Sequence, residues 1–212
     1  GYMYTDTGFW DTFRCLFPLL NLVYPSRNRE IQEGLINTYK ESGFFPEWAS
    51  PGHRGCMVGN NSASVLADAY LKGVRVADVE ALYAGLVHGT EHVHPKASST
   101  GRLGNEYYNK LGYVPYNVGI NESAARTLEY AYDDWCISQL AEAMGDEPNR
   151  TKYAAFAEGY KVYFDPSTRF MRGLDSEGNW RTPFNPRAST HRNDDYCEGT
   201  AWQWTWFVPH ES

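Results

Sequence analysis

The chain has 212 residues, of which 42% are hydrophobic and 21% are charged, and its formal net charge is −7. This length and composition are typical of one globular domain with a substantial core. The negative charge, without any basic stripe, argues against a nucleic-acid partner. No apolar run approaches the roughly 20 residues that a membrane-spanning helix needs, so no membrane span is expected.

Two features of the chain bear on its chemistry and its completeness. Its four cysteines form no CxxC pair, which argues against zinc; they can be buried thiols, and a disulfide is an open alternative. The chain begins at Gly1 without methionine or a visible signal peptide and stops abruptly at Ser212, so we expect a piece of a longer protein. The cysteines are Cys15, Cys56, Cys136 and Cys197.

Apolar residues recur every three to four positions along most of the chain, which is the spacing of amphipathic helices. In one such helix Ala63, Leu66, Ala67 and Tyr70 share a face. The helices expected from this pattern cover residues 10–23, 26–43, 62–73, 76–92, 105–111, 122–144, 148–164 and 194–210.

Several residues mark or disturb these helices. Asn121 should cap the start of the longest helix, and Gly43 should end an earlier one in a left-handed conformation. Pro18 should kink the first helix, because proline removes a backbone donor. Asp133 and Asp134 fall in the middle of the longest helix, where they are unfavourable unless they are exposed or paired.

Long loops at residues 44–61, 96–119 and 165–186 join the helices, and a small hairpin is expected near Gly178. The absence of βαβ alternation excludes a parallel sheet, and no fixed-period repeat is visible. The predicted fold is therefore all-α, a layered or toroidal array of helix pairs. Loops at one end of such an array are expected to carry the functional site.

Two polar groups outside the C-terminal segment invite a functional interpretation. His53 and Arg54 lie on the first long loop, where they are candidates for ligand binding; a solvated arginine in a turn is an equally good interpretation. The spacing of His88, His92 and His94 lacks an HExxH motif, so surface or capping histidines are favoured over a metal site.

Residues 194–210, DDYCEGTAWQWTWFVPH, contain an isolated carboxylate, Glu198, followed by Trp202, Trp204 and Trp206. Aromatic surroundings, with Tyr196 also close in sequence, solvate a charged carboxylate poorly and favour the protonated form that a general acid needs. Aromatic rings also suit the C–H faces of a sugar. The alternative is a buried aromatic helix or strand in which Glu198 makes a structural hydrogen bond.

Five motifs together resemble glycoside hydrolase family 92, the calcium-dependent, inverting exo-α-mannosidases. They occur in the expected order: GYMYTDTGFWDTFR, SPGHRGCMVGNNSASVLADAYLKG, ARTLEYAYDDWCISQLA, YKVYFDPSTRFMRG and YCEGTAWQWTWFVPH. The resemblance implies an (α/α)6 barrel preceded by a β-sandwich domain, and secretion or a periplasmic location. It implies release of terminal mannose, most often α-1,2-linked, from N-glycans or mannan, with calcium as cofactor.

The resemblance also assigns roles to residues of this chain. Glu198 in YCEGTAW matches the general acid, and Trp10 and Asp11 in FWDTF match residues that line the terminal mannose pocket, with Asp11 bonding its hydroxyls. Arg54 matches a partner of the same sugar. Gln203 is polar and close to the acid, so it is a weaker candidate to approach the metal, whose ligands the sequence otherwise leaves unknown.

One departure from the family pattern matters for activity. An inverting enzyme needs a second carboxylate as base, and in this family the base motif lies beyond the FVPH segment. Residues 1–212 are therefore expected to be a segment of the barrel, incomplete at its C-terminal end, without the β-sandwich and inactive alone. The alternatives are a non-catalytic mannose-binding or structural remnant and, as a poor fit, a polysaccharide lyase.

Overall fold

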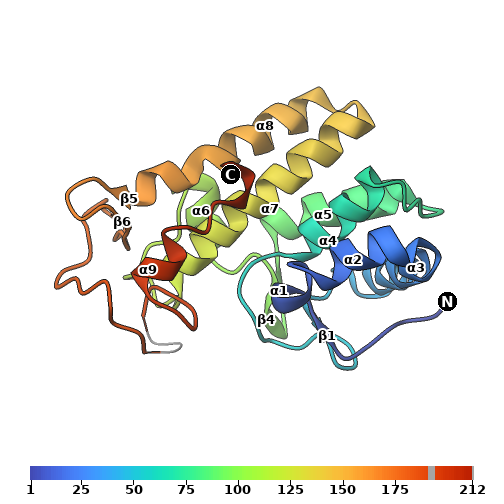
Figure 1. Ribbon diagram of the computed structural model, residues 1–212, viewed down its shortest axis with the longest axis horizontal. Helices are drawn as coiled ribbons and strands as arrows, with labels where there is room; N and C mark the ends of the chain where they lie inside the picture. The colour runs from blue at the N-terminus through green and yellow to red at the C-terminus, as the bar shows by residue number, and fades with distance from the viewer. Residues whose placement is uncertain (191–193, 212) are drawn as a thin grey trace.

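The computed structural model describes residues 1–190 and 194–211, and most of its regular structure is helical (Figure 1), which confirms the predicted helical character. The helices are α1 (Phe9–Thr12), α2 (Leu16–Val23), α3 (Pro25–Ser42), α4 (Ser62–Leu71), α5 (Val79–Glu91), α6 (Asn105–Leu111), α7 (Ser123–Met144), α8 (Glu147–Ala157) and α9 (Ala201–Trp204), with 3-10 turns η1 (Glu158–Tyr163) and η2 (Pro209–Glu211).

The described strands are short and form three separate antiparallel pairs, none of which the sequence pattern predicts. They are β1 (Thr7–Gly8) with β2 (Trp48–Ala49), β3 (Val93–His94) with β4 (Ala97–Gly101), and β5 (Phe164–Asp165) with β6 (Phe170–Met171). The expected small hairpin is present as a bridge between Leu174 and Trp180, with Gly178 at a φ of 85° in its turn.

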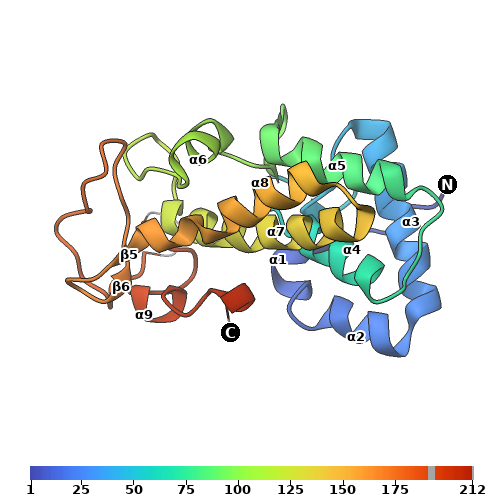
Figure 2. The ribbon, with the colours of Figure 1, turned by 90° about the horizontal axis from the view of Figure 1, so that it is seen from above.

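Helix α7 is the central element of the fold. It lies beside α8 in both ribbon views and packs against α4 on another side (Figures 1 and 2). Most of its residues are buried, as expected for a helix whose small and apolar side chains surround its axis. Helices α2 to α5 lie toward one end of α7, while α6, α9 and the β5–β6 hairpin lie toward the other (Figure 2).

The core consists of two main hydrophobic clusters along α7. One joins α7 to the N-terminal helices, and the other lies beneath the C-terminal segment. The first includes Phe9, Phe17, Ile36, Leu66, Leu86 and Ile137, and the second includes Val58, Leu128, Tyr163, Met171, Ala201 and Trp204. Of the four cysteines, Cys136 and Cys197 are buried thiols and Cys15 is an exposed one.

The two mid-helix aspartates are buried and paired rather than exposed. Asp134 forms an ion pair with the fully buried Arg102, with 2.7 Å between Arg102 Nη2 and Asp134 Oδ1. Asp133 accepts the backbone N–H of Asn60 at 2.7 Å. Asn60 lies just before α4 and Arg102 just after β4, so both aspartates of α7 have partners on neighbouring segments.

Several predicted helix boundaries hold and others need correction. Gly43 ends α3 with a φ of 80°, as predicted. Residues 10–23 form two helices, with the break before Leu16; Pro18 lies in the first turn of α2, where its missing N–H disrupts no bond, so it causes no kink. Asn121 does not cap α7, because Glu122 is the N-cap residue at a φ of 62° and makes no side-chain cap bond.

The prediction of one helix over residues 194–210 is wrong. Only α9 and η2 are helical there. Asp194 and Asp195 offer their carbonyl groups to backbone N–H groups of residues 122–125, and Glu198 has a left-handed φ of 48°. The chain therefore cannot enter a helix before Thr200.

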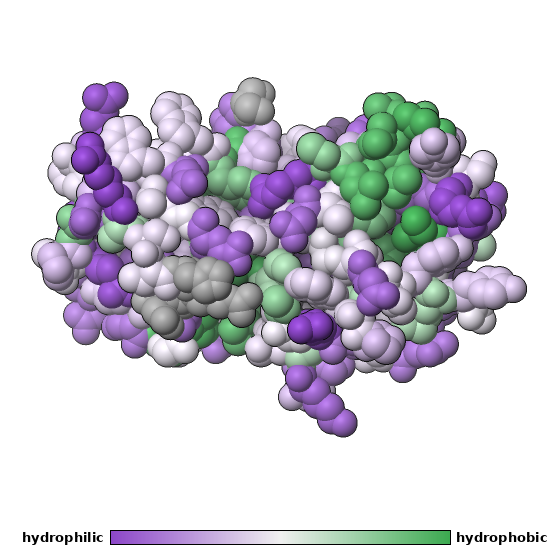
Figure 3. Space-filling view, turned by 60° about the horizontal axis from the view of Figure 1, so that its bottom comes forward, coloured by the Kyte–Doolittle hydropathy of each residue, from purple (hydrophilic) through white to green (hydrophobic). Residues whose placement is uncertain are grey.

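Apolar side chains are not all buried. Helix α2 exposes Leu16, Leu19, Leu22 and Val23, and Figure 3 shows an extended apolar area on this face of the molecule. None of the helices described is both long and apolar enough to cross a bilayer.

Candidate active site

The segment before Glu198 is anchored on the first turn of α7. The N–H of Glu122 donates to the carbonyl of Asp194 at 2.9 Å, and those of Ala124 and Ala125 donate to the carbonyl of Asp195 at 2.9 and 3.0 Å. A helix start leaves four N–H groups without intrahelical partners. Here another part of the chain satisfies three backbone donors at the α7 start, in place of the predicted side-chain cap.

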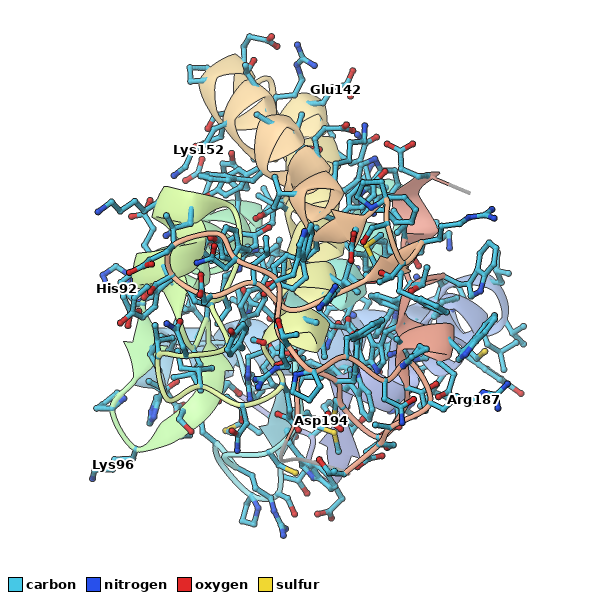
Figure 4. All side chains as sticks on the ribbon, turned by 90° about the vertical axis from the view of Figure 1, so that its left-hand side faces the viewer. His92, Lys96, Glu142, Lys152, Arg187 and Asp194 are labelled. Carbon is cyan, nitrogen blue, oxygen red and sulfur yellow. The ribbon has the colours of Figure 1, made fainter. Side chains whose placement is uncertain are left out.

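Side chains strengthen this anchor. The Asp195 carboxylate accepts two bonds from Arg181, with Nε–Oδ2 at 2.6 Å and Nη2–Oδ1 at 2.7 Å, and a third from the Ser123 hydroxyl at 3.2 Å. A Cβ at Gly173 would lie 2.2 Å from Asp195 Oδ2, so a larger residue there would displace the carboxylate. These bonds fix the position of residues 194–195, just before Glu198; Asp194 is labelled in Figure 4.

The residues after Glu198 are held equally closely. The Gln203 side-chain oxygen accepts the Thr200 N–H at 2.7 Å and completes a capping box at the start of α9. The Trp204 indole donates to the Cys197 carbonyl at 2.9 Å. Glu198 lies between these two fixed points, in a left-handed conformation that costs about 1–2 kcal/mol for a residue other than glycine.

The aromatic enclosure expected around Glu198 is only partly present. Its side chain is exposed. The Tyr196 hydroxyl donates to the Met171 carbonyl, and Trp202 packs against Phe170 with ring centroids 4.9 Å apart, in a different pocket. Of the residues predicted to surround the carboxylate, Trp204 is the one that shares a cavity with it.

Trp10 and Glu198, which come from opposite ends of the chain, line the same two cavities. One cavity measures about 90 Å³ and the other about 260 Å³. The walls of the smaller one also include Met57, Ser99, Glu122, Arg126 and Cys197. Those of the larger one also include Arg14, Gln203, Trp204 and Phe207. The structure therefore brings together an aromatic face and a carboxylate of the kind that a sugar site needs.

Asp11 and Arg54 are not in the walls of these cavities. Asp11 is exposed on α1, one residue after Trp10. Arg54 is exposed, and its guanidinium lies 5.3 Å from the ring centroid of Trp48. The backbone N–H of Arg54 donates to the Trp48 carbonyl at 3.0 Å. The two residues lie on the β1–β2 side of the fold in this chain.

Sequence reasoning missed four charged residues of this region. The Trp10 indole donates to Glu129 Oε1 at 2.7 Å, and Arg14 Nη2 contacts the same oxygen at 3.2 Å. Burial raises the pKa of Glu129 to about 8, and the Arg14 charge opposes this rise. Glu122 and Arg126 form an ion pair at 2.9 Å in the wall of the smaller cavity. For Glu129 and Arg126 the available signal was a charge on a helix otherwise rich in small and apolar residues; no local signal indicated Arg14 or Glu122.

The side chains described do not assemble a metal site by themselves. Across residues 1–190 and 194–211, no three His, Cys, Asp or Glu side chains gather closely enough to hold a metal ion. Calcium takes six to eight oxygen ligands, and the side-chain oxygen of Gln203 already accepts the Thr200 N–H. The described part of the chain does not fit a complete calcium site, so we derive no catalytic step through this ion.

The histidines near α5 have structural contacts. The rings of His88 and His92 stack with centroids 3.9 Å apart, and His92 Nδ1 bonds the His88 carbonyl at 2.9 Å. His94 Nδ1 accepts the Ala97 N–H at 3.1 Å in the β3–β4 turn. Figure 4 shows His92 and Lys96 at the edge of the molecule opposite Arg187. These contacts support the predicted surface and capping roles.

Comparison with known proteins decides the family. The whole chain, residues 1–212, matches the Glycosyl hydrolase family 92 catalytic domain. The chain belongs to this family. The resemblance inferred from the five sequence motifs is thereby confirmed.

Solved structures of family members share the fold of this chain. An inverting mannosidase from Bacteroides thetaiotaomicron is 48% identical, with a TM-score of 0.95 over 99% of this chain. An α-mannosidase from the same organism is 37% identical, with a TM-score of 0.87 over 98%. A protein of Arthroderma benhamiae named as an uncharacterized secreted glycosidase is 29% identical over 84% of this chain. The chain spans 28%, 27% and 26% of these three relatives.

Proposed function

We propose that this chain is part of the catalytic domain of an inverting α-mannosidase that releases terminal, α-1,2-linked mannose from N-glycans or mannan. The observation that carries the proposal is the meeting of Trp10 and Glu198 in the walls of shared cavities. It is supported by the family and by the relative described as an inverting mannosidase, which shares 48% identity. The secreted relative supports secretion or a periplasmic location.

Each predicted site residue has a role in this proposal. Trp10 stacks against the terminal mannose, and Asp11 and Arg54 bond its hydroxyls once the rest of the protein closes the site. Glu198 donates a proton to the departing glycosidic oxygen while water attacks from the opposite face. Calcium, when bound, would help to hold the sugar hydroxyls, with ligands supplied largely from outside the described residues.

The remaining parts of the enzyme are expected elsewhere in the full-length protein. These are the general base, a preceding β-sandwich and the helices that complete an (α/α)6 barrel. The exposed apolar face of α2 supports this organisation, because a large exposed apolar area usually marks a surface that another part covers. Without the base, this segment alone should not turn over a mannoside.

The test is Glu198→Gln in the full-length protein that carries this chain. The amide keeps the shape but cannot supply the proton, so hydrolysis of a natural mannoside should fall about 100- to 10,000-fold. An aryl mannoside with a good leaving group needs little protonation and should lose much less. Glu142→Gln, an exposed change at the far end of α7, is the control and should leave both rates unchanged.

Equal losses for the two substrates would show that Glu198 is not the acid. Absence of mannosidase activity in the unaltered full-length protein, with mannose still bound, would favour a non-catalytic mannose-binding role. Turnover by residues 1–212 alone would contradict the placement of the base outside this segment.

A further inference from the structure

We propose that Glu129 is a positioning residue that holds the Trp10 indole in place as a wall of the active site, with Arg14 as the third member of the arrangement. The inference rests on the proposed function for its catalytic consequence, although the geometry that carries it lies entirely within the described residues. Glu129 does not itself line either cavity that contains Glu198.

The Glu129 side chain is fully buried, and one of its oxygens serves both partners. Oε1 accepts the Trp10 indole N–H at 2.7 Å and contacts Arg14 Nη2 at 3.2 Å. The Arg14 contact is charge-assisted because the guanidinium is ionised, and such bonds are shorter and roughly twice as strong as neutral ones. A buried carboxyl group on the central helix α7 thus fixes the direction of an indole that lines the candidate site.

Trp10 needs such a partner because of the element that carries it. It lies on α1, a helix of four residues without a side-chain cap. A single turn has little intrinsic stability, since helix nucleation is unfavourable. The Trp10–Glu129 bond joins residues 119 positions apart and ties this turn to α7, the central helix of the fold.

Arg14 contacts both Trp10 and Glu129. Its Nε donates to the Trp10 carbonyl at 3.0 Å while Nη2 contacts Glu129. Its guanidinium packs near the rings of Trp10, Phe13 and Phe207, at 5.5, 4.6 and 5.1 Å from their centroids. Both the backbone and the indole of Trp10 are therefore held, and Arg14 itself lines the larger cavity.

Packing alone does not account for a carboxyl group at this point. Taking a carboxylate out of water costs several kcal/mol, and an apolar side chain of similar volume would fill the space without that cost. Glu129 Oε2 is buried and makes no hydrogen bond to a residue that the structure describes. Burial raises the pKa of Glu129 to about 8, so near neutral pH Oε2 can carry the proton while Oε1 accepts from Trp10.

The kinetic test compares Glu129→Leu, Glu129→Gln, Trp10→Phe and the double variant Trp10→Phe/Glu129→Leu in the full-length protein. Trp10→Phe keeps an aromatic ring but removes the N–H. Misplacement of a site group by about 1 Å can cost roughly 100-fold, so Glu129→Leu should lower kcat/KM about 10- to 100-fold. Glu129→Gln, which keeps an oxygen acceptor, should retain most of the activity, and the double variant should be no worse than Glu129→Leu.

A second readout does not depend on mannosidase activity. In protein labelled with 5-fluorotryptophan, the ¹⁹F signal of Trp10 is the one lost in Trp10→Phe. Glu129→Leu should shift or broaden this signal. Ile137→Ala, a cavity-forming change in the other core cluster of α7, should lower the Tm without moving it.

The outcomes separate the two proposals. An unmoved Trp10 signal in Glu129→Leu, or strictly additive kinetic losses in the double variant, would overturn the positioning role. If Glu129→Leu does not fold, loss of activity in Glu129→Gln with an unmoved Trp10 signal contradicts the role. If the Trp10 signal shifts in Glu129→Leu but the unaltered protein hydrolyses no mannoside, the positioning role of Glu129 stands and the proposed enzyme function is rejected.

Discussion

Removal of the Arg102 charge should destabilise the protein more than most single substitutions. Arg102 and Asp134 are both fully buried, and Arg102 Nη2 lies 2.7 Å from Asp134 Oδ1. The guanidinium also lies near the rings of Tyr108 and Tyr130, at 5.7 and 5.3 Å from their centroids. Arg102→Met keeps the apolar contact and removes the cation, so Asp134 loses its counter-charge in a fully buried site.

The magnitude follows from the burial of the pair. Loss of one partner of a buried ion pair costs about 3–5 kcal/mol. Burial already raises the pKa of Asp134, and its protonation in the variant relieves part of the penalty, so the lower end, about 3 kcal/mol, is expected. At about 2–4 °C per kcal/mol for a domain of this size, the Tm should fall by roughly 6–12 °C at pH 7.

The assay is thermal unfolding followed by circular dichroism, with Arg102→Met/Asp134→Asn as the matched control. The double variant carries no lone charge and should recover about 1–3 kcal/mol relative to the sum of the single changes. The Tyr108 hydroxyl, which donates to Asp134 Oδ2 at 2.9 Å, can still donate to an asparagine oxygen. A Tm of Arg102→Met within 2 °C of the unaltered protein, or additive losses, would refute the reasoning.

The remaining predictions concern the Glu198 anchor and the buried acids. Asp195→Asn removes charge from both Arg181 contacts and should cost about 1–2 kcal/mol, since Arg181 is 39% exposed; unchanged Tm and mannoside turnover in the full-length protein would contradict the anchoring role. Burial raises the pKa of Glu47 to about 8 and of Asp133 to about 7, above their unfolded values. The native state then holds protons that the unfolded chain releases, so stability should fall as the pH rises from 6.5 to 8. Glu47→Gln should flatten this Tm slope, and a rising Tm would be the contrary result.

Helices whose partners lie nearby in sequence were predictable. Residues 105–111 form α6 within the predicted bounds, and Gly43 ends α3 as expected, because local periodicity and a left-handed end residue suffice for such elements. Residues 194–210 carry a similar apolar pattern but are not one helix. Their conformation depends on distant groups, the N–H donors of α7 and Arg181, which no local pattern can reveal.

The residues of the candidate site also differ in how far the sequence alone reveals them. Glu198 and Trp10 were candidates from the family motifs, and the structure places both in the walls of the same cavities; their roles stay predictions. The arrangement that holds Trp10 was not predicted, because Glu129 on a helix of ordinary spacing suggests a solvated charge. Its importance depends on α7 being buried on nearly every side, and this burial comes from packing of the whole fold.

The order of the site residues along the chain has a consequence during biosynthesis. Trp10 and Glu198 lie near opposite ends of the sequence, and the N–H groups at the start of α7 find their partners only in Asp194 and Asp195. At about 5–20 residues per second, a ribosome adds Glu198 roughly 10–40 s after Trp10. Until residues 194–195 emerge, the start of α7 lacks these partners, although Trp10 can already bond Glu129. Trp10 and Glu198 therefore come together only after residues 194–198 emerge and dock on α7.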